Sequence, residues 1–192
     1  MTFQNVASVC LFALFVIIVL IRAAMLRKRG IRVLVFGQTD KSDFILVPIV
    51  LAIAYTALAR TFELPIWDVL IYPFWSGELA GGIGLALCAA AITGFALTLV
   101  SFGNSFRVGI DVAKPDKLVT SGMFSVSRNP IYVCLLLFFI GLFLIHRNIV
   151  ITVAVILFAL AIHRQVLREE RFLAEHYGEE YEEYCKKVRR YL

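Results

Sequence analysis

The residues best suited to chemistry lie in two short polar blocks that flank a pair of apolar runs. The first block contains Arg128, Asn129 and Tyr132, and the second contains the adjacent carboxylates Glu169 and Glu170. A guanidinium and a carboxylate in one site can bind the two charges of an amino-acid group, and a tyrosine ring can attract a cation. Arginines and paired carboxylates beside apolar helices are costly to keep and are often functional. We therefore treat the two blocks as parts of one candidate site.

Each of these side chains also has a simpler structural explanation. Arg128 could anchor a helix end at a membrane surface, and Tyr132 could belong to an aromatic belt there. Glu169 and Glu170 could be solvated helix charges paired with arginines four residues away. These explanations are favoured for each residue taken singly, whereas the combination of both blocks favours a site.

The composition of the chain predicts that most of it lies in a membrane. Hydrophobic residues make up 60% of its 192 residues, and the mean hydropathy is +0.85. Soluble domains are about 45–50% apolar, so a soluble protein of this size could not bury the excess. We predict an all-α integral membrane bundle of five transmembrane helices with cytoplasmic C-terminal helices, built as a single domain over residues 1–192. The spans are predicted at residues 2–22, 43–61, 79–104, 130–146 and 148–166.

The basic residues predict how this bundle is oriented. With five spans, 17 of the 19 lysines and arginines lie on one side of the membrane, and the other side keeps Arg60 and Arg147. Positive charge accumulates in the cytoplasmic loops of membrane proteins. We therefore expect a multi-pass protein with its N-terminus outside and its C-terminus and candidate site in the cytoplasm.

The last two apolar runs are separated by His146 and Arg147, which predicts a tight helical hairpin. In a hairpin, the start of one helix lies beside the end of the next. We therefore expect the block at Arg128 to face the segment that begins at His163. This segment is rich in charge and tyrosine, and Gly178 is expected to end one helix within it and allow a second to begin.

Four motifs in this region are similar to those of a known family. They are LVTSGMF at residues 118–124, RNPIY at 128–132, EERFL at 169–173 and YGEEY at 177–181 with Tyr184 after it. In this order and spacing they resemble the isoprenylcysteine carboxyl methyltransferase family, whose usual patterns are LVTSGxY, RHPxY, EExxL and FGxxYxxY. The sequence differs at Asn129, where the family usually has histidine, and at Phe124, where tyrosine is frequent.

The resemblance implies a carboxyl O-methyltransferase that uses S-adenosylmethionine and releases S-adenosylhomocysteine, with a cofactor region at about residues 108–192 and no metal. By motif matching, the residues implied to bind the cofactor are Lys117, Leu118, Val119, Asn129, Pro130, Ile131 and Tyr132, together with His163 by position. Arg128, Glu169 and Glu170 are the implied catalytic residues, and Arg164, Gln165 and Arg168 the implied substrate-binding residues.

The expected partners are a lipophilic methyl acceptor that enters from the bilayer and the membrane lipid itself. We expect no nucleic acid partner, and the sequence leaves the oligomeric state open. Three other functions remain open: a phospholipid or amine N-methyltransferase, in which Glu169 or Glu170 would act as a base; an NADPH-dependent reductase of the sterol type; and a non-enzymatic membrane scaffold. The four cysteines form no CxxC pair, so we predict neither a disulfide framework nor a zinc site.

Overall fold

The computed structural model describes residues 2–28, 45–75, 77–102 and 118–192. The regular elements in these ranges are all helical, which confirms the predicted all-α class. In chain order they are α1 (Phe3–Lys28), α2 (Leu46–Phe62), α3 (Asp68–Ile71), α4 (Glu78–Phe102), the 3-10 helix η3 (Gly122–Ser125), α5 (Pro130–His146), α6 (Ile149–Tyr177) and α7 (Glu179–Lys187).

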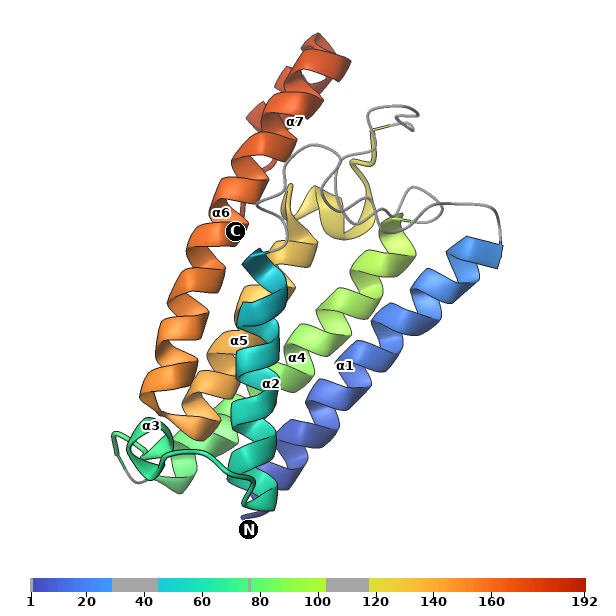
Figure 1. Ribbon diagram of the computed structural model, residues 1–192. Coiled ribbons are helices and arrows are strands. Elements are labelled where there is room, and N and C mark those ends of the chain that lie inside the picture. The colour runs from blue at the N-terminus through green and yellow to red at the C-terminus, as the bar shows by residue number, and fades with distance from the viewer. Residues whose placement is uncertain (1, 29–44, 76, 103–117) are drawn as a thin grey trace.

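Five long helices form one bundle, with the N-terminus at one end and the candidate site at the other (Figure 1). Among the described residues, α1, α4 and α6 are long and apolar enough to cross a membrane. The other two, α2 and α5, are apolar helices of 17 residues each, which is near the lower limit for crossing. The described residues therefore establish an integral membrane bundle with three candidate spans and two shorter apolar helices.

Small residues allow α4 and α5 to pack closely. A Cβ atom added at Gly84 would lie 2.6 Å from the backbone oxygen of Gly141, and one added at Gly141 would lie 2.6 Å from Cys88 Sγ. The Cys88 thiol also donates a hydrogen bond of 3.4 Å to the carbonyl of Phe138. Close backbone approach at small residues is the usual way that membrane helices gain contact area. This interface holds α5, and with it the first polar block, in a defined position.

Aromatic rings fill the centre of the bundle. Phe15 of α1 packs against Phe95 of α4 at 4.6 Å and against Phe138 of α5 at 5.0 Å between ring centroids. Phe139 continues the cluster to Phe158 of α6 at 4.4 Å. Large apolar side chains elsewhere on α1, α2 and α6 are exposed on the bundle surface, as expected for helices that face lipid. These rings join α1, α4, α5 and α6, and Ile49 and Ile53 of α2 belong to the same buried core.

The turn between α5 and α6 has the tightness that the sequence predicts. Arg147 ends α5 in the left-handed conformation with φ of 53°, and its backbone N–H donates to the carbonyl of Phe143. Asn148 caps α6, because its side-chain oxygen accepts a 3.0 Å hydrogen bond from the backbone N–H of Ile151. The start of α5 consequently lies beside the later turns of α6.

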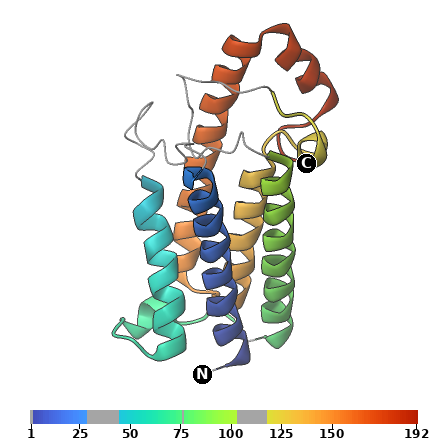
Figure 2. The ribbon, with the colours of Figure 1, turned by 90° about the vertical axis from the view of Figure 1, so that its right-hand side faces the viewer.

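Helix α6 continues beyond the bundle, and α7 folds back from its end (Figure 2). At about 1.5 Å per residue, its 29 residues extend for about 44 Å, compared with about 30 Å for the apolar part of a bilayer. Gly178, with φ of 51°, makes the reversal between α6 and α7, as predicted. The predicted span 148–166 is thus part of a longer helix that runs without interruption to Tyr177.

Candidate functional site

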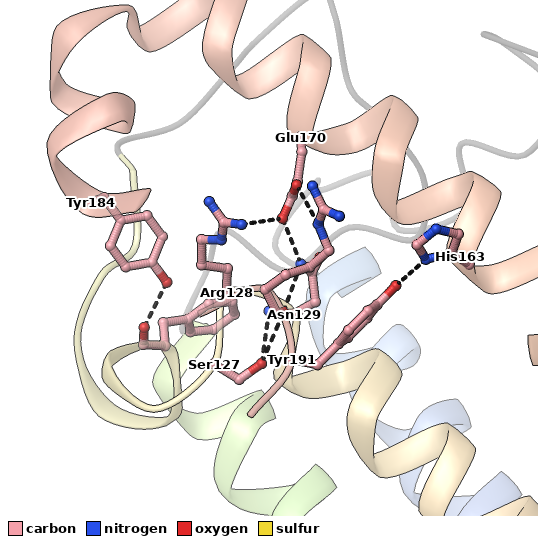
Figure 3. Close-up of polar contacts among 9 residues, drawn as sticks. Ser127, Arg128, Asn129, His163, Glu170, Tyr184 and Tyr191 are labelled. Atoms are coloured by element: carbon pink, nitrogen blue, oxygen red, sulfur yellow. Dashed lines mark hydrogen bonds and ion pairs between the residues drawn. The ribbon is translucent and has the colours of Figure 1, made fainter. Parts of the chain in front are cut away.

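The site is formed where three segments meet: the start of α5, the outer half of α6 and the end of the chain (Figure 3). Pro130 occupies the first turn of α5, a position that suits its fixed φ and its lack of an N–H. Asn129 precedes it at a position where asparagine often caps a helix, but its side chain makes no capping bond. The amide of Asn129 points instead toward α6.

Glu170 is the centre of the polar contacts in this site. Its Oε1 accepts a hydrogen bond of 3.1 Å from Asn129 Nδ2 and lies 3.3 Å from a terminal nitrogen of Arg128. Its Oε2 accepts a 2.8 Å hydrogen bond from Arg190 Nε. The Glu170 side chain is 10% exposed and that of Arg128 is 13% exposed. One largely buried carboxylate therefore faces two guanidinium groups, which leaves this group of three with an excess positive charge.

The end of the chain, here called the C-terminal segment (188–192), closes the site. The backbone N–H of Arg128 donates to the carbonyl of Arg189 at 2.9 Å. The carbonyl of Arg190 accepts hydrogen bonds from Ser127 Oγ at 3.3 Å and from Asn129 Nδ2 at 3.1 Å. These bonds attach the C-terminal segment to the residues just before α5, and the Arg190 side chain reaches across to α6.

Three contributors to the site were not identified from the sequence. Arg190 and Ser127 make the bonds just described, and the hydroxyl of Tyr191 shares a 2.7 Å hydrogen bond with Nδ1 of His163. Nothing in the sequence distinguishes Arg190 from the neighbouring Arg189, whose side chain is exposed. The return of the chain end to the start of α5 is a property of the tertiary fold, so local patterns could not have shown it.

A second apolar cluster positions α7 and the C-terminal segment. Tyr181, Tyr184 and Val188 are buried together, with Leu118 among the partly buried residues packed against them. The hydroxyl of Tyr184 donates a 2.6 Å hydrogen bond to the carbonyl of Phe124 in η3. Burial raises the pKa of Tyr184 to about 12, so the hydroxyl remains a donor at neutral pH. These contacts explain why the chain end returns to the bundle.

Glu169 belongs to a separate polar network that faces α2. Its Oε1 accepts hydrogen bonds from Tyr132 at 2.6 Å and from Gln165 Nε2 at 2.8 Å. Arg168 in turn donates to Gln165 Oε1. The two carboxylates of the predicted block thus have different surroundings, with Glu170 in the guanidinium cluster and Glu169 beside a tyrosine and an amide.

A cleft of about 200 Å³ lies between the start of α2 and α6, next to the Glu169 network. Its apolar wall comes from Ile45 and Leu46 on one side and Leu160 and Ala161 on the other. Arg164, Gln165 and Arg168 provide its polar wall. The three residues implied to bind the substrate therefore line one cleft, and Gln165 connects it to Glu169.

The remaining predicted residues lie around these two groups. Ile131 and Tyr132 pack partly against the main apolar core. Leu118 packs against the α7 cluster, and neighbouring Val119 is partly buried. His163 is exposed on α6 and contacts Tyr191. Lys117, with the first part of the predicted cofactor region, lies outside the described residues.

Several known proteins are similar to this chain, and the matching family model covers both polar blocks. A model of the phospholipid methyltransferase family matches residues 83–180. A probable protein-S-isoprenylcysteine O-methyltransferase of Oryza sativa subsp. japonica is 30% identical over 149 residues, which cover 72% of each chain. Its counterpart in Oryza sativa subsp. indica has the same identity and coverage. The cobalt-zinc-cadmium resistance protein CzcN of Cupriavidus metallidurans is 39% identical over 76 residues, 39% of this chain and 35% of that protein.

Proposed function

Because this chain belongs to the isoprenylcysteine carboxyl methyltransferase family and is a membrane methyltransferase, we propose that it methylates the carboxylate of a prenylcysteine-like or other lipophilic acceptor with S-adenosylmethionine. The observation that carries this proposal is that a charged cluster and a cleft lie next to each other on α6. A cluster of opposite charges around Glu170 lies next to an arginine-lined cleft, because Glu169, the neighbour of Glu170 in α6, accepts hydrogen bonds from Tyr132 and from Gln165 of the cleft wall.

The cluster around Glu170 fits the amino-acid group of S-adenosylmethionine. That group carries an ammonium and a carboxylate, so its site needs an acceptor of negative charge and a donor of positive charge. Glu170 supplies the first and Arg128 the second. Arg128 Nε is buried and has no hydrogen-bond partner among the described residues, which is the state expected of a donor that serves a ligand. The bound cofactor would supply a methyl group activated on a sulfonium.

The cleft between α2 and α6 supports a lipophilic acid as the acceptor. Arg164 and Arg168 can hold a carboxylate, which is already ionised at neutral pH and needs no base to react. A cleft of about 200 Å³ is smaller than the roughly 300–1,000 Å³ of pockets that enclose a drug-sized ligand. We therefore propose that the cleft receives the acceptor's head and the first part of its chain, and that the rest extends into the bilayer between the helices.

Placement in the membrane follows from the same proposal. We infer that α2 and α5 cross the membrane together with α1, α4 and α6, giving five spans. The N-terminus and the candidate site lie at opposite ends of the bundle (Figure 1), as an odd number of spans requires. Since 17 of the 19 basic residues would share the side of the candidate site, that side is proposed to be cytoplasmic.

A second candidate is N-methylation of a phospholipid amine. It is favoured by the match to the phospholipid methyltransferase family model and by the contact between Glu169 and Tyr132. An amine must lose a proton before it attacks a methyl group, and Glu169 would be the base. Against this, the two guanidiniums of Arg164 and Arg168 in the cleft wall would repel an ammonium head group.

Transfer of a labelled methyl group distinguishes these candidates. Purified protein in nanodiscs is given labelled S-adenosylmethionine with a prenylcysteine analogue, a fatty acid or phosphatidylethanolamine. The proposal predicts label on an acid acceptor as a methyl ester, which alkali releases as methanol. Alkali-stable label on phosphatidylethanolamine would establish the second candidate instead. Titration that shows NADPH binding and no S-adenosylhomocysteine binding would exclude both.

Variants of the two sites test the residue roles. Glu170→Ala and Arg128→Ala are expected to abolish binding of S-adenosylhomocysteine in calorimetry, with the protein still inserted in the membrane. Arg164→Ala with Arg168→Ala is expected to raise the KM for the acceptor and leave cofactor affinity unchanged. Glu175→Ala, an exposed carboxylate on the same helix, serves as the control. Normal cofactor affinity in both of the first variants would show that the cofactor binds elsewhere.

A further inference from the structure

The side chain of Arg190 is held over Glu170 by contacts that its own main chain makes. Its carbonyl accepts bonds from Ser127 and Asn129, and the preceding carbonyl of Arg189 accepts a bond from the N–H of Arg128. These anchors involve backbone atoms of the C-terminal segment, so they do not depend on the guanidinium of Arg190. The segment therefore presents this guanidinium to the site as a separate, positioned group.

The guanidinium of Arg190 has bonding capacity that the described part of the chain does not use. It contacts Glu170 through Nε at 2.8 Å, and among the described residues neither of its terminal nitrogens has a partner. The Arg190 side chain is 39% exposed, whereas that of Glu170 is 10% exposed. The two terminal nitrogens form one edge of a planar fork, which matches the two oxygens of a carboxylate.

The charges around Glu170 also favour an added anion. Arg128 and Arg190 both contact this carboxylate, so two positive charges face one negative charge. Oε1 of Glu169 lies in the other network, where it accepts hydrogen bonds from Tyr132 and Gln165. A ligand with an ammonium and a carboxylate adds no net charge, but each of its groups would meet an opposite charge, with the ammonium at Glu170 and the carboxylate at the outer guanidinium.

We infer that Arg190 binds the carboxylate of the cofactor's amino-acid group, so that the C-terminal segment forms part of the cofactor site. This inference rests on the proposed use of S-adenosylmethionine. It assigns a ligand contact to a residue outside the range matched by the family model, which ends at residue 180. Arg190, whose side chain is 39% exposed, then binds this carboxylate from the more exposed side, in addition to Arg128, whose side chain is 13% exposed.

The test compares two ligands on the full-length protein in nanodiscs by calorimetry. One is S-adenosylhomocysteine, and the other is its decarboxylated analogue, which keeps the adenosine, the thioether and the amine. Wild-type protein is expected to bind the first about 10- to 100-fold more tightly, the range of a hydrogen bond between charged groups. Arg190→Gln is expected to remove this preference by weakening S-adenosylhomocysteine alone. Arg190→Lys should restore part of it.

The control is Arg189→Gln, which removes the same charge from an exposed side chain in the same segment and should leave both affinities unchanged. If Arg190→Gln weakens both ligands equally, Arg190 has a structural role and the inference is wrong. It is equally wrong if the variant keeps the wild-type preference, or if the wild type shows no preference. A wild type that binds neither ligand would instead overturn the proposed cofactor.

Discussion

Replacement of Glu170 by glutamine tests whether ion pairing holds the C-terminal segment against α6. Glu170→Gln keeps the shape of the side chain but leaves two guanidiniums without their counter-ion. Removing one partner of a buried pair costs about 3–5 kcal/mol, whereas a well-exposed pair contributes about 0–1 kcal/mol. Arg128 is 13% exposed and Arg190 is 39% exposed, so the site lies between these limits. We expect the docking of the segment to lose about 2–4 kcal/mol.

Amide hydrogen exchange measures this loss locally. The backbone N–H of Arg128 is a suitable reporter, because it donates to the carbonyl of Arg189 in the docked segment. A loss of about 2–4 kcal/mol should speed its exchange about 30- to 1,000-fold. Amides in the α4–α5 interface should exchange as in the wild type, since nothing at Glu170 contacts them. The control is Glu175→Gln, which removes an exposed carboxylate from the same helix.

A double variant shows whether the contact itself is responsible. If the ion pair matters, Glu170→Gln combined with Arg190→Gln should cost less than the sum of the two single changes, because one of the uncompensated charges is gone. Strict additivity would mean that the contact between Glu170 and Arg190 contributes nothing to docking. The reasoning also fails if Glu170→Gln speeds exchange at Arg128 no more than Glu175→Gln does.

Three further variants test packing, titration and ring chemistry. Gly141→Leu should prevent close approach of α4 and α5 and lower the free energy of unfolding in detergent by about 1–3 kcal/mol. Gly82→Leu should be tolerated, because a Cβ atom added at Gly82 would meet no atom of a neighbouring element within 4 Å. Because burial raises the pKa of Tyr184 from 10.0 to about 12, its contribution to the docking of α7 should be complete below pH 10 and lost as pH rises toward 12. The tyrosinate absorbance that Tyr184→Phe removes should therefore develop near pH 12, and a normal titration near pH 10 would contradict the burial argument. Tyr132→Phe should weaken S-adenosylhomocysteine binding less than Tyr132→Ala if the ring rather than the hydroxyl makes the contact, and calorimetry would show equal losses if the hydroxyl is what matters.

The meeting of the two polar blocks could be predicted from the sequence, because it follows from chain geometry. Two apolar runs joined by His146 and Arg147 have to form a hairpin, so residues before the first run lie near residues after the second. The bonds from Asn129 to Glu170 and from Tyr132 to Glu169 agree with that expectation. The different surroundings of the two carboxylates were not predictable, since adjacent helical positions differ by about 100° and their neighbours depend on how α6 is rotated in the bundle.

The position of Arg190 was not predictable, because it depends together on the length of α6, on the turn at Gly178 and on the length of α7. Helix α6 extends beyond the bundle, Gly178 reverses the chain, and the nine residues of α7 return it toward η3. Tyr184 anchors the returning helix, because its hydroxyl donates to the carbonyl of Phe124 in η3 and its ring is buried with Tyr181 and Val188.

The proposed function explains why a polar C-terminal half would be joined to an apolar bundle. A lipophilic acid and a charged cofactor favour different environments, so one site can serve both only at the boundary between lipid and water. In the proposed placement helix α6 crosses this boundary, with its cleft residue Leu160 on the apolar side and Glu170 nearly three turns further along. Arg164 and Gln165 lie between them on the same helix. In this proposal the spacing along one helix sets the distance between acceptor and donor sites, so a change in that spacing should impair transfer more than it impairs binding of either ligand.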